Sequence, residues 1–192
     1  LPVDRLIIAT NRNDILSRFV HTGVYAAGEV YPTLSPAMDI QIASNFERYL
    51  YFLLGEDPMA VRHLLEGMAR TGRLEVEGER HAQVRADFEA LAVSDAETLD
   101  QMRATFAQTH YVLDPHTAIG VRAAQGAPDT ICLATAHPAK FGEAVTQAIG
   151  HEAPPPRSLQ GLWEKETRCA HLEASPAAIR AHILATLEAA SQ

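Results

Sequence analysis

The chain has 192 residues and a formal net charge of −8, with 47% of its residues hydrophobic and 21% charged. This size is sufficient for one substantial hydrophobic core, or for a large piece of a larger one. The acidic balance and the absence of a Lys/Arg cluster argue against nucleic-acid binding, because a phosphate backbone attracts basic surfaces. No apolar run reaches the roughly 18 residues of a membrane span, and no targeting signal opens the chain. We therefore expect a cytoplasmic protein without membrane or nucleic-acid partners.

The first apolar run, residues 5–10 (RLIIAT), is rich in β-branched side chains and is typical of a strand that is covered on both faces. The polar residues 11–14 follow, and apolar residues then recur at helical spacing over residues 15–20. Strand, polar turn and helix indicate an α/β unit, in which ligands bind at the carboxyl ends of strands. The chain begins Leu1-Pro2 without Met and reaches this strand almost at once, so we expect a segment of a longer protein.

The middle of the chain is predicted to be helical. Ser35-Pro36 is typical of a helix start, and apolar residues at spacing four then predict one long helix to about residue 54. Asp57-Pro58 predicts a further helix to about residue 70, followed by a glycine-rich turn region over 71–80. A capping box formed by Ser94 and Glu97 predicts the start of another helix.

The last third begins with Asp114-Pro115, which predicts a helix over about 116–124. Residues 130–135 form a second apolar run, predicted as a buried strand that contains Cys132 as a reduced, buried thiol. A helix through residue 149 follows, and then an extended linker at 153–157. The last predicted helix starts at Ser175-Pro176, and its inward side chains are expected to be Ile179, Ile183 and Leu187.

Five polar clusters contain the candidate functional residues. They are TNRND (10–14), LSPAMD (34–39), SNFER (44–48), DPHTA (114–118) and TAHPAKF (135–141). Each cluster alone is more simply explained as a turn or a helix cap. Asp114, His116 and His137 are the candidate ligands for a metal site, since the chain has nine histidines. The histidines lack helical H-x₃-H spacing and Asp114 has a capping role, so we predict no metal site.

Taken together, the five clusters resemble the threonine synthase family of fold-type-II pyridoxal-phosphate enzymes. The resemblance spans about residues 1–150, and its longest phrases are ATNRNDIL, TLSPAMDI, SNFER, DPHTA and TAHPAKF. It implies an α/β fold, the C-terminal part of a fold-type-II enzyme (tryptophan synthase beta-like), helix-rich with few parallel strands. Residues 1–150 would then form part of the cofactor-binding domain with a helical insertion at about 36–124. Residues 151–192 would form a linker and a C-terminal helical tail.

The resemblance also implies an activity, the conversion of O-phospho-L-homoserine and water to L-threonine and phosphate. The family's Schiff-base lysine and its glycine-rich phosphate loop would lie upstream of Leu1. Lys140 and Lys165 are the only lysines in the chain, and neither matches the residue that bonds the cofactor. We therefore expect the isolated chain to be inactive, with no catalytic residue of its own and doubtful cofactor binding.

The resemblance assigns one residue to the cofactor. Thr135 matches the Ser or Thr that contacts the pyridine nitrogen in fold-type-II enzymes, although a threonine before a helix can also serve as a cap. Six further residues are candidates for the substrate pocket: Asn13, Asp14, Ser35, Asn45, Arg48 and Lys140. Arg48 and Lys140 have the charge that a phosphate requires, while Arg48 beside Glu47 could also be part of an ordinary helix ion pair.

Two alternative functions stay open. A related phospho-lyase on the same fold would release ammonia as well as phosphate, and its motifs would look similar. A non-catalytic relative would instead bind a partner or a small ligand. For the isolated chain, a sheet without its neighbouring strands would expose strand edges and apolar faces, so self-association is possible.

Overall fold

The structure is a computed structural model that describes residues 3–127, 129–167 and 169–190. It divides into two compact units, Leu1–Pro154 and Pro155–Gln192. The Leu1-Pro2 start, which contributed to the expectation of a longer protein, lies outside the described residues. All candidate site residues belong to the first unit.

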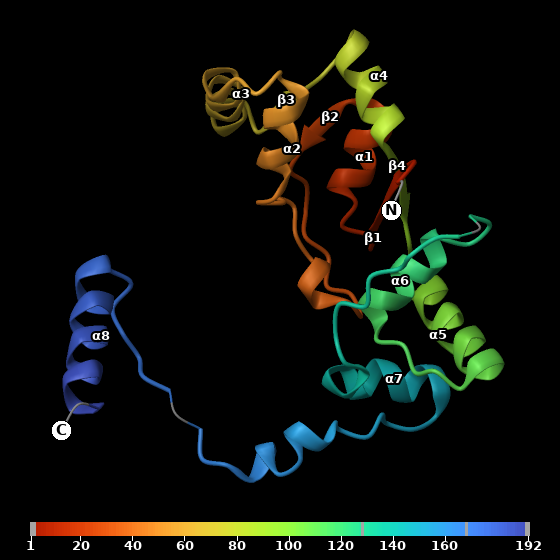
Figure 1. The fold of residues 1–192 in the computed structure, drawn as a ribbon, viewed down its shortest axis with the longest axis vertical. Helices are drawn as coiled ribbons and strands as arrows, with labels where there is room; N and C mark the ends of the chain where they lie inside the picture. Colours follow the sequence, from red (N-terminus) through yellow and green to blue (C-terminus); the bar gives the residue numbers. More distant parts are fainter. Residues whose placement is uncertain (1–2, 128, 168, 191–192) are drawn as a thin grey trace. The chain divides into compact units, whose positions relative to one another are not determined.

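Two small sheets organise the first unit (Figure 1). The strands are β1 (Leu6–Thr10), β2 (Val24–Ala26), β3 (Arg73–Glu75) and β4 (Phe88–Ala92). β1 and β4 are parallel, with Leu6 opposite Phe88 and Thr10 opposite Ala92, whereas β2 and β3 are antiparallel. β1 confirms that residues 5–10 contain a strand, and the parallel pair confirms the α/β class. The expected cover on both faces is wrong for the described residues, because Leu6 is 54% exposed and only Thr10 of β1 is buried.

Helices make up most of the described structure. The α-helices are α1 (Ile15–Thr22), α2 (Phe46–Leu53), α3 (Pro58–Thr71), α4 (Gly78–Asp87), α5 (Asp95–Thr109), α6 (Pro115–Ala123), α7 (Gly142–Ile149) and α8 (Pro176–Ala190). Short 3₁₀ helices are η1 (Pro36–Met38), η2 (Pro138–Phe141), η3 (Arg157–Leu159) and η4 (Leu162–Glu164). Figure 1 shows α1 and α4 near the β1–β4 pair, and α5, α6 and α7 gathered at the end where β1 and β4 finish. Among the described helices, none is both long and apolar enough to cross a lipid bilayer.

Side-chain caps start several helices where the sequence predicted them. Asp57 accepts hydrogen bonds from the backbone N–H groups of Met59 and Ala60 at the start of α3. Ser94 and Glu97 form the predicted capping box at the start of α5. Such caps satisfy N–H groups that have no partner inside the helix, and they explain why these boundaries could be predicted.

The prediction of one long helix from residue 36 to residue 54 is wrong. The chain forms η1, leaves helical geometry at 39–45, and resumes as α2. Side-chain hydrogen bonds hold residues 39–45 in a non-helical conformation. The side chain of Gln41 accepts a hydrogen bond from the N–H of Gly28 and donates one to the carbonyl of Glu29. The Tyr25 hydroxyl likewise accepts from the N–H of Ala43. Side-chain hydrogen bonds to backbone groups compete with a helix in this way.

The prediction of a buried strand at 130–135 is also wrong. Residues 130–135 have no strand assignment, and no described strand pairs with them. Ile131 is 74% exposed and Leu133 is 78% exposed, and Cys132 is a partly exposed free thiol. An apolar run alone does not supply the neighbouring backbone that a strand requires.

The region 71–80 contains more regular structure than the predicted turn. It includes β3 and the start of α4, and β4, which was not predicted, follows α4. Gly23 joins α1 to β2 in a left-handed conformation, with φ = 77°. A Cβ at Gly23 would lie 2.2 Å from the carbonyl oxygen of Val76, so only glycine fits where these two segments meet.

Two hydrophobic clusters stabilise the first unit. One joins β1, β4 and α1–α4; the other lies among α5, α6 and α7, with Met102 and Val145 fully buried. In the second unit, the predicted inward side chains of α8 are exposed instead, with Ile179 at 47% and Ile183 at 52%. Within the described residues, the core lies in the first unit.

Candidate functional site

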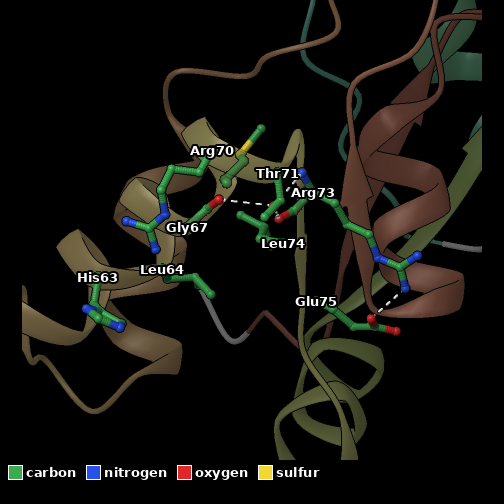
Figure 2. Close-up of a pocket in the computed structure, with 9 residues that line it drawn as sticks. His63, Leu64, Gly67, Arg70, Thr71, Arg73, Leu74 and Glu75 are labelled. Atoms are coloured by element: carbon green, nitrogen blue, oxygen red, sulfur yellow. Dashed lines mark hydrogen bonds and ion pairs between the residues drawn. The ribbon is translucent and has the colours of Figure 1, made fainter.

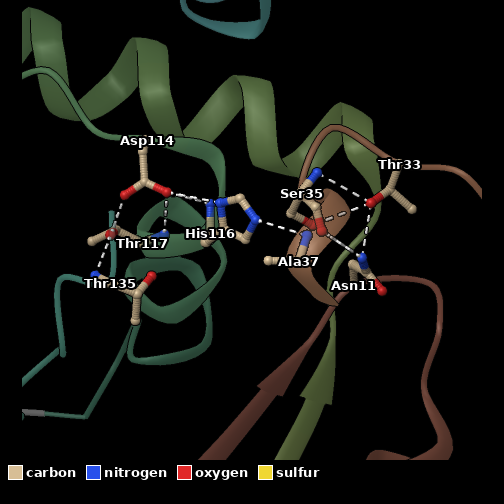
Figure 3. A network of polar contacts seen from close by, with 8 residues as sticks. All are labelled: Asn11, Thr33, Ser35, Ala37, Asp114, His116, Thr117 and Thr135. Carbon is tan, nitrogen blue, oxygen red and sulfur yellow. Dashed lines mark hydrogen bonds and ion pairs between the residues drawn. The ribbon is translucent and has the colours of Figure 1, made fainter. Parts of the chain in front are cut away.

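Asn11 directly follows β1 and is 1% exposed. Its amide nitrogen lies 2.8 Å from Oγ1 of Thr33, 3.0 Å from Oγ of Ser35 and 2.7 Å from Oδ1 of Asp39. Asp39 in turn accepts hydrogen bonds from the backbone N–H and the hydroxyl of Thr33. The loop over the end of β1 is therefore fixed by side chains (Figure 3). We call Asn11, Asn13, Thr33, Ser35 and Asp39 the turn network.

Asn13 completes the turn network. Its Oδ1 accepts from the N–H of Tyr31 at 2.8 Å, and its Nδ2 donates to the carbonyl of Tyr31 at 2.8 Å and to Asp39 at 3.0 Å. Asn13 is 2% exposed and Ser35 is 1% exposed. Both predicted residues thus come together at the carboxyl end of β1, where their polar atoms shape the loop.

A second buried network lies at the start of α6. Asp114 is 1% exposed and accepts from the backbone N–H of His116 at 2.9 Å. The same carboxylate accepts from Nδ1 of His116 at 2.9 Å and from the hydroxyl of Thr117. We call Asp114, His116 and Thr117 the cap network. The desolvated carboxylate is stabilised because each of its oxygens accepts a hydrogen bond.

His116 connects the cap network to the turn network. The backbone N–H of Ala37, in η1, donates to Nε2 of His116 at 3.3 Å. Nε2 must therefore be an acceptor, which places the ring proton on Nδ1, where it is donated to Asp114. The hydrogen-bond pattern thus assigns a neutral imidazole with one defined tautomer.

Thr135 lies at the other end of this chain of hydrogen bonds. Its backbone N–H donates to Oγ1 of Thr117 at 3.2 Å, and that hydroxyl donates to Asp114 (Figure 3). The Thr135 side chain is exposed. The predicted cofactor residue is therefore held through its backbone, and no hydrogen bond of its hydroxyl occurs among the described residues.

The other predicted residues lie apart from these networks. Asp14 pairs with Arg18 at 2.8 Å in the first turn of α1. Asn45 and Arg48 belong to the start of α2, where both are exposed, and no ion pair of Arg48 occurs among the described residues. Lys140 is exposed in η2, with its Nζ 5.8 Å from the centre of the Phe141 ring. Hydrogen bonds thus connect Asn13 with Ser35 inside the turn network. Thr135 is connected to Ala37, which lies in the same loop as Ser35, and these four residues take part in neither connection.

Cavities among the described residues of the first unit lie elsewhere. A shallow one of about 270 Å³ lies between α3 and β3, where Arg73 pairs with Glu75 and the Thr71 hydroxyl donates to the carbonyl of Gly67 (Figure 2). An apolar one of about 200 Å³ is lined by side chains of β1, α1, α2 and β4, with Asn45 among them. Neither cavity is lined by Thr135 or by the turn network.

Several residues of both networks were not predicted as site residues. Asn11, Asp39 and Thr117 stand inside the quoted clusters, and their importance follows only from their burial and from partners distant in sequence. The one available signal was position, since Asn11 directly follows a buried strand. His116 was considered only as a metal ligand; in the structure it bonds Asp114 and Ala37, while Nδ1 of His137 accepts from the N–H of Ala139.

Comparison with known proteins gives consistent matches. Residues 117–183 match the family model described as threonine synthase, C-terminal. The chain is 44% identical to the threonine synthase of Pseudomonas aeruginosa, across 95% of this chain and 40% of that protein. It is 37% identical to the threonine synthase of Schizosaccharomyces pombe, across 88% of this chain and 40% of that protein. The chain thus spans about 40% of the length of the curated relatives it matches.

The solved structures that resemble this chain are also threonine synthases. The PLP-bound threonine synthase from Brucella melitensis matches with a TM-score of 0.80 and 42% identity, across 86% of this chain and 37% of that one. Yeast threonine synthase matches with a TM-score of 0.79 and 35% identity, across 86% of this chain and 38% of that one. The fold is therefore that of the C-terminal part of a fold-type-II enzyme. Within that class, the chain belongs to the threonine synthase family, as a C-terminal portion.

Proposed function

We propose that the protein containing this chain converts O-phospho-L-homoserine and water to L-threonine and phosphate, with pyridoxal phosphate as its cofactor. The observation that supports this most is the similarity to threonine synthases over 95% of the chain. When bound, the cofactor supplies the electron sink for the reaction. The residues of this chain orient the cofactor and substrate. The cytoplasm is proposed as its compartment.

Thr135 is proposed to donate a hydrogen bond from its hydroxyl to the pyridine nitrogen. The structure is compatible with this role in two respects. The side chain is exposed and its hydroxyl has no hydrogen bond within the described residues, while the backbone is held by Thr117. A neutral hydroxyl can donate one hydrogen bond without placing a charge beside the ring.

The substrate pocket is proposed to include Asn13, Asp14, Ser35, Asn45, Arg48 and Lys140. Asn13 and Ser35 would act by shaping the loop at the carboxyl end of β1, because both are buried in the turn network. Arg48 and Lys140 are exposed cations, and either could bind the substrate phosphate. Arg48→Gln and Lys140→Gln distinguish the two residues. Replacing the residue that binds phosphate should raise the KM for O-phospho-L-homoserine about tenfold or more, whereas replacing the other residue should leave the KM unchanged.

The central experiment uses the full-length protein loaded with pyridoxal phosphate. Threonine and phosphate should form in equal amounts from O-phospho-L-homoserine, measured by amino-acid analysis and a phosphate assay. Thr135→Ser keeps the hydroxyl and should retain activity, whereas Thr135→Val should change the cofactor's absorbance and lower kcat. Release of ammonia with phosphate, and no threonine, would instead identify the phospho-lyase.

The chain alone is proposed to be inactive, because Lys140 and Lys165 are its only lysines and neither is assigned the bond to the cofactor. Pyridoxal phosphate added to the isolated chain should produce no lysine-linked absorbance and no threonine. Leu91, Ile131 and Leu133 are exposed in this chain, so size-exclusion chromatography should show self-association. A borohydride-reducible adduct on Lys140 would refute the proposed inactivity.

A further inference from the structure

His116 contacts Asp114 at the start of its own helix and two segments that are distant in sequence. Nδ1 donates to Asp114 at 2.9 Å, and Nε2 accepts from the N–H of Ala37 at 3.3 Å. The ring of Phe141, in η2, lies 4.6 Å from the His116 ring between centroids. His116 is 8% exposed. Two hydrogen bonds and one aromatic contact therefore fix the position of its ring.

The polar contacts form one continuous series. It starts at the N–H of Thr135, passes through Thr117, Asp114 and His116, and ends at the N–H of Ala37 in η1. Ser35, two residues before Ala37, belongs to the turn network. Figure 3 shows the imidazole between the cap network and the turn. The turn with Ser35 and the segment with Thr135 are therefore linked through Thr117, Asp114 and the neutral ring of His116.

We propose that His116 is a positioning residue that holds the turn containing Ser35 in register with the segment containing Thr135. The inference rests on the proposed function, in which one segment serves the substrate and the other the cofactor. His116 touches neither ligand and acts through Ala37 on one side and through Asp114 and Thr117 on the other. Displacement of either segment by ~1 Å is enough to lower catalysis substantially.

Two substitutions separate the two halves of this link. The amide nitrogen of Asn takes the position of Nδ1, so His116→Asn keeps the hydrogen bond to Asp114 and loses the acceptor for Ala37. The longer His116→Gln places its amide oxygen near the position of Nε2, so it keeps the acceptor for Ala37 and loses the donor to Asp114. Neither substitution introduces a charge.

In the full-length enzyme with cofactor, His116→Asn should raise the KM for O-phospho-L-homoserine about tenfold while the cofactor's absorbance and affinity stay unchanged. His116→Gln should instead change the cofactor's absorbance and weaken its binding. Thr117→Val, which removes the acceptor for Thr135, should reproduce the His116→Gln result, and Thr117→Ser should restore the wild-type values.

A matched control is His81, whose Nε2 bonds the carbonyl of Val20 at 3.0 Å. His81→Asn, whose shorter side chain does not reach the position of Nε2, should lower thermal stability without changing KM or the cofactor's absorbance. If His116→Asn and His116→Gln likewise change only stability, or change KM and absorbance identically, the proposed positioning role is wrong.

Hydrogen exchange of the peptides that contain Ala37 and Thr135 tests the link without any activity. His116→Asn should accelerate exchange at Ala37 and leave Thr135 protected, and Thr117→Val should do the reverse. If the wild-type protein forms no threonine, the proposed function fails, and the exchange result still decides whether His116 joins the two segments. Unchanged exchange in both variants would contradict the inference in an active or an inactive enzyme.

Discussion

Two regions around β1 are stabilised in different ways. On one face of the β1–β4 pair lies an aromatic cluster formed by Phe19, Tyr25, Phe46, Tyr49 and Phe88. At the carboxyl end of β1 lies the turn network, which is held almost wholly by hydrogen bonds. Apolar packing depends on volume and tolerates changes of shape, whereas a buried hydrogen-bond network depends on every donor and acceptor. The two regions should therefore respond differently to equally small substitutions.

The largest effect is expected in the turn network. Asp39 accepts from Asn11, Asn13 and Thr33. Asp39→Ala therefore removes one acceptor from each of these three side chains, and it removes the acceptor of the Thr33 backbone N–H. We expect the free energy of unfolding to fall by about 3 kcal/mol, measured by chemical denaturation of the full-length protein. Asp39→Asn, which keeps one acceptor oxygen, should lose less. Equal losses in the two variants would show that the hydrogen bonds contribute little.

The aromatic cluster should lose less from a comparable change. Phe46 stacks on Tyr25 at 4.6 Å and meets Phe19 edge-on at 4.7 Å. Phe46→Leu keeps an apolar side chain and should cost about 1.5 kcal/mol. Phe52 lies in the same helix and is 60% exposed, so Phe52→Leu is a matched control that should change stability by less than about 0.5 kcal/mol. A loss at Phe46 larger than that at Asp39 would reverse the comparison.

Tyr49 is the polar exception within the aromatic cluster. Burial, followed by the hydrogen bond from its hydroxyl to Asp87 at 2.8 Å, raises the pKa of Tyr49 above its ordinary value. The folded state therefore retains this proton more strongly, so the stabilisation is fully present below about pH 10 and is lost as the pH rises further. Tyr49→Phe should flatten the decline of stability above that pH. An unchanged alkaline profile in denaturation experiments would assign the decline to other groups.

The smallest effect, with the opposite sign, is expected at the junction of the two regions. The hydroxyl of Thr10 is buried and has no hydrogen-bond partner among the described residues. Thr10→Val has nearly the same shape and removes that hydroxyl, so it should stabilise the fold by roughly 1 kcal/mol. Thr10→Ser keeps the hydroxyl and should not stabilise. A destabilised Thr10→Val variant would mean that the hydroxyl does have a partner in the full-length protein.

The sequence was sufficient to predict those parts of the structure that depend on residues adjacent in the chain. The strand at 5–10, the caps at Asp57 and Asp114 and the Ser94 capping box each depend on a few consecutive side chains. The position of Asn13 directly after the predicted strand is local in the same sense. These features could be predicted without knowing any distant partner.

Prediction failed where distant partners decide the structure. The helix predicted from residue 36 is interrupted because Gln41 bonds to Gly28 and Glu29, and Ala43 bonds to Tyr25. The run at 130–135 has the composition of a strand but no described neighbour. The link through His116 joins positions about 80 residues apart, since Ala37 and His116 are separated by 79 residues, and no local pattern contains it.

The pairing of Leu6 with Phe88 has a consequence for the order of folding. β1 leaves the ribosome long before its partner strand, and the intervening residues must be synthesised and brought back before the parallel ladder can close. Closing so long a loop costs conformational entropy before any contact in the ladder is gained. During synthesis, the nascent β1 should therefore remain without this partner strand until residue 92 has emerged.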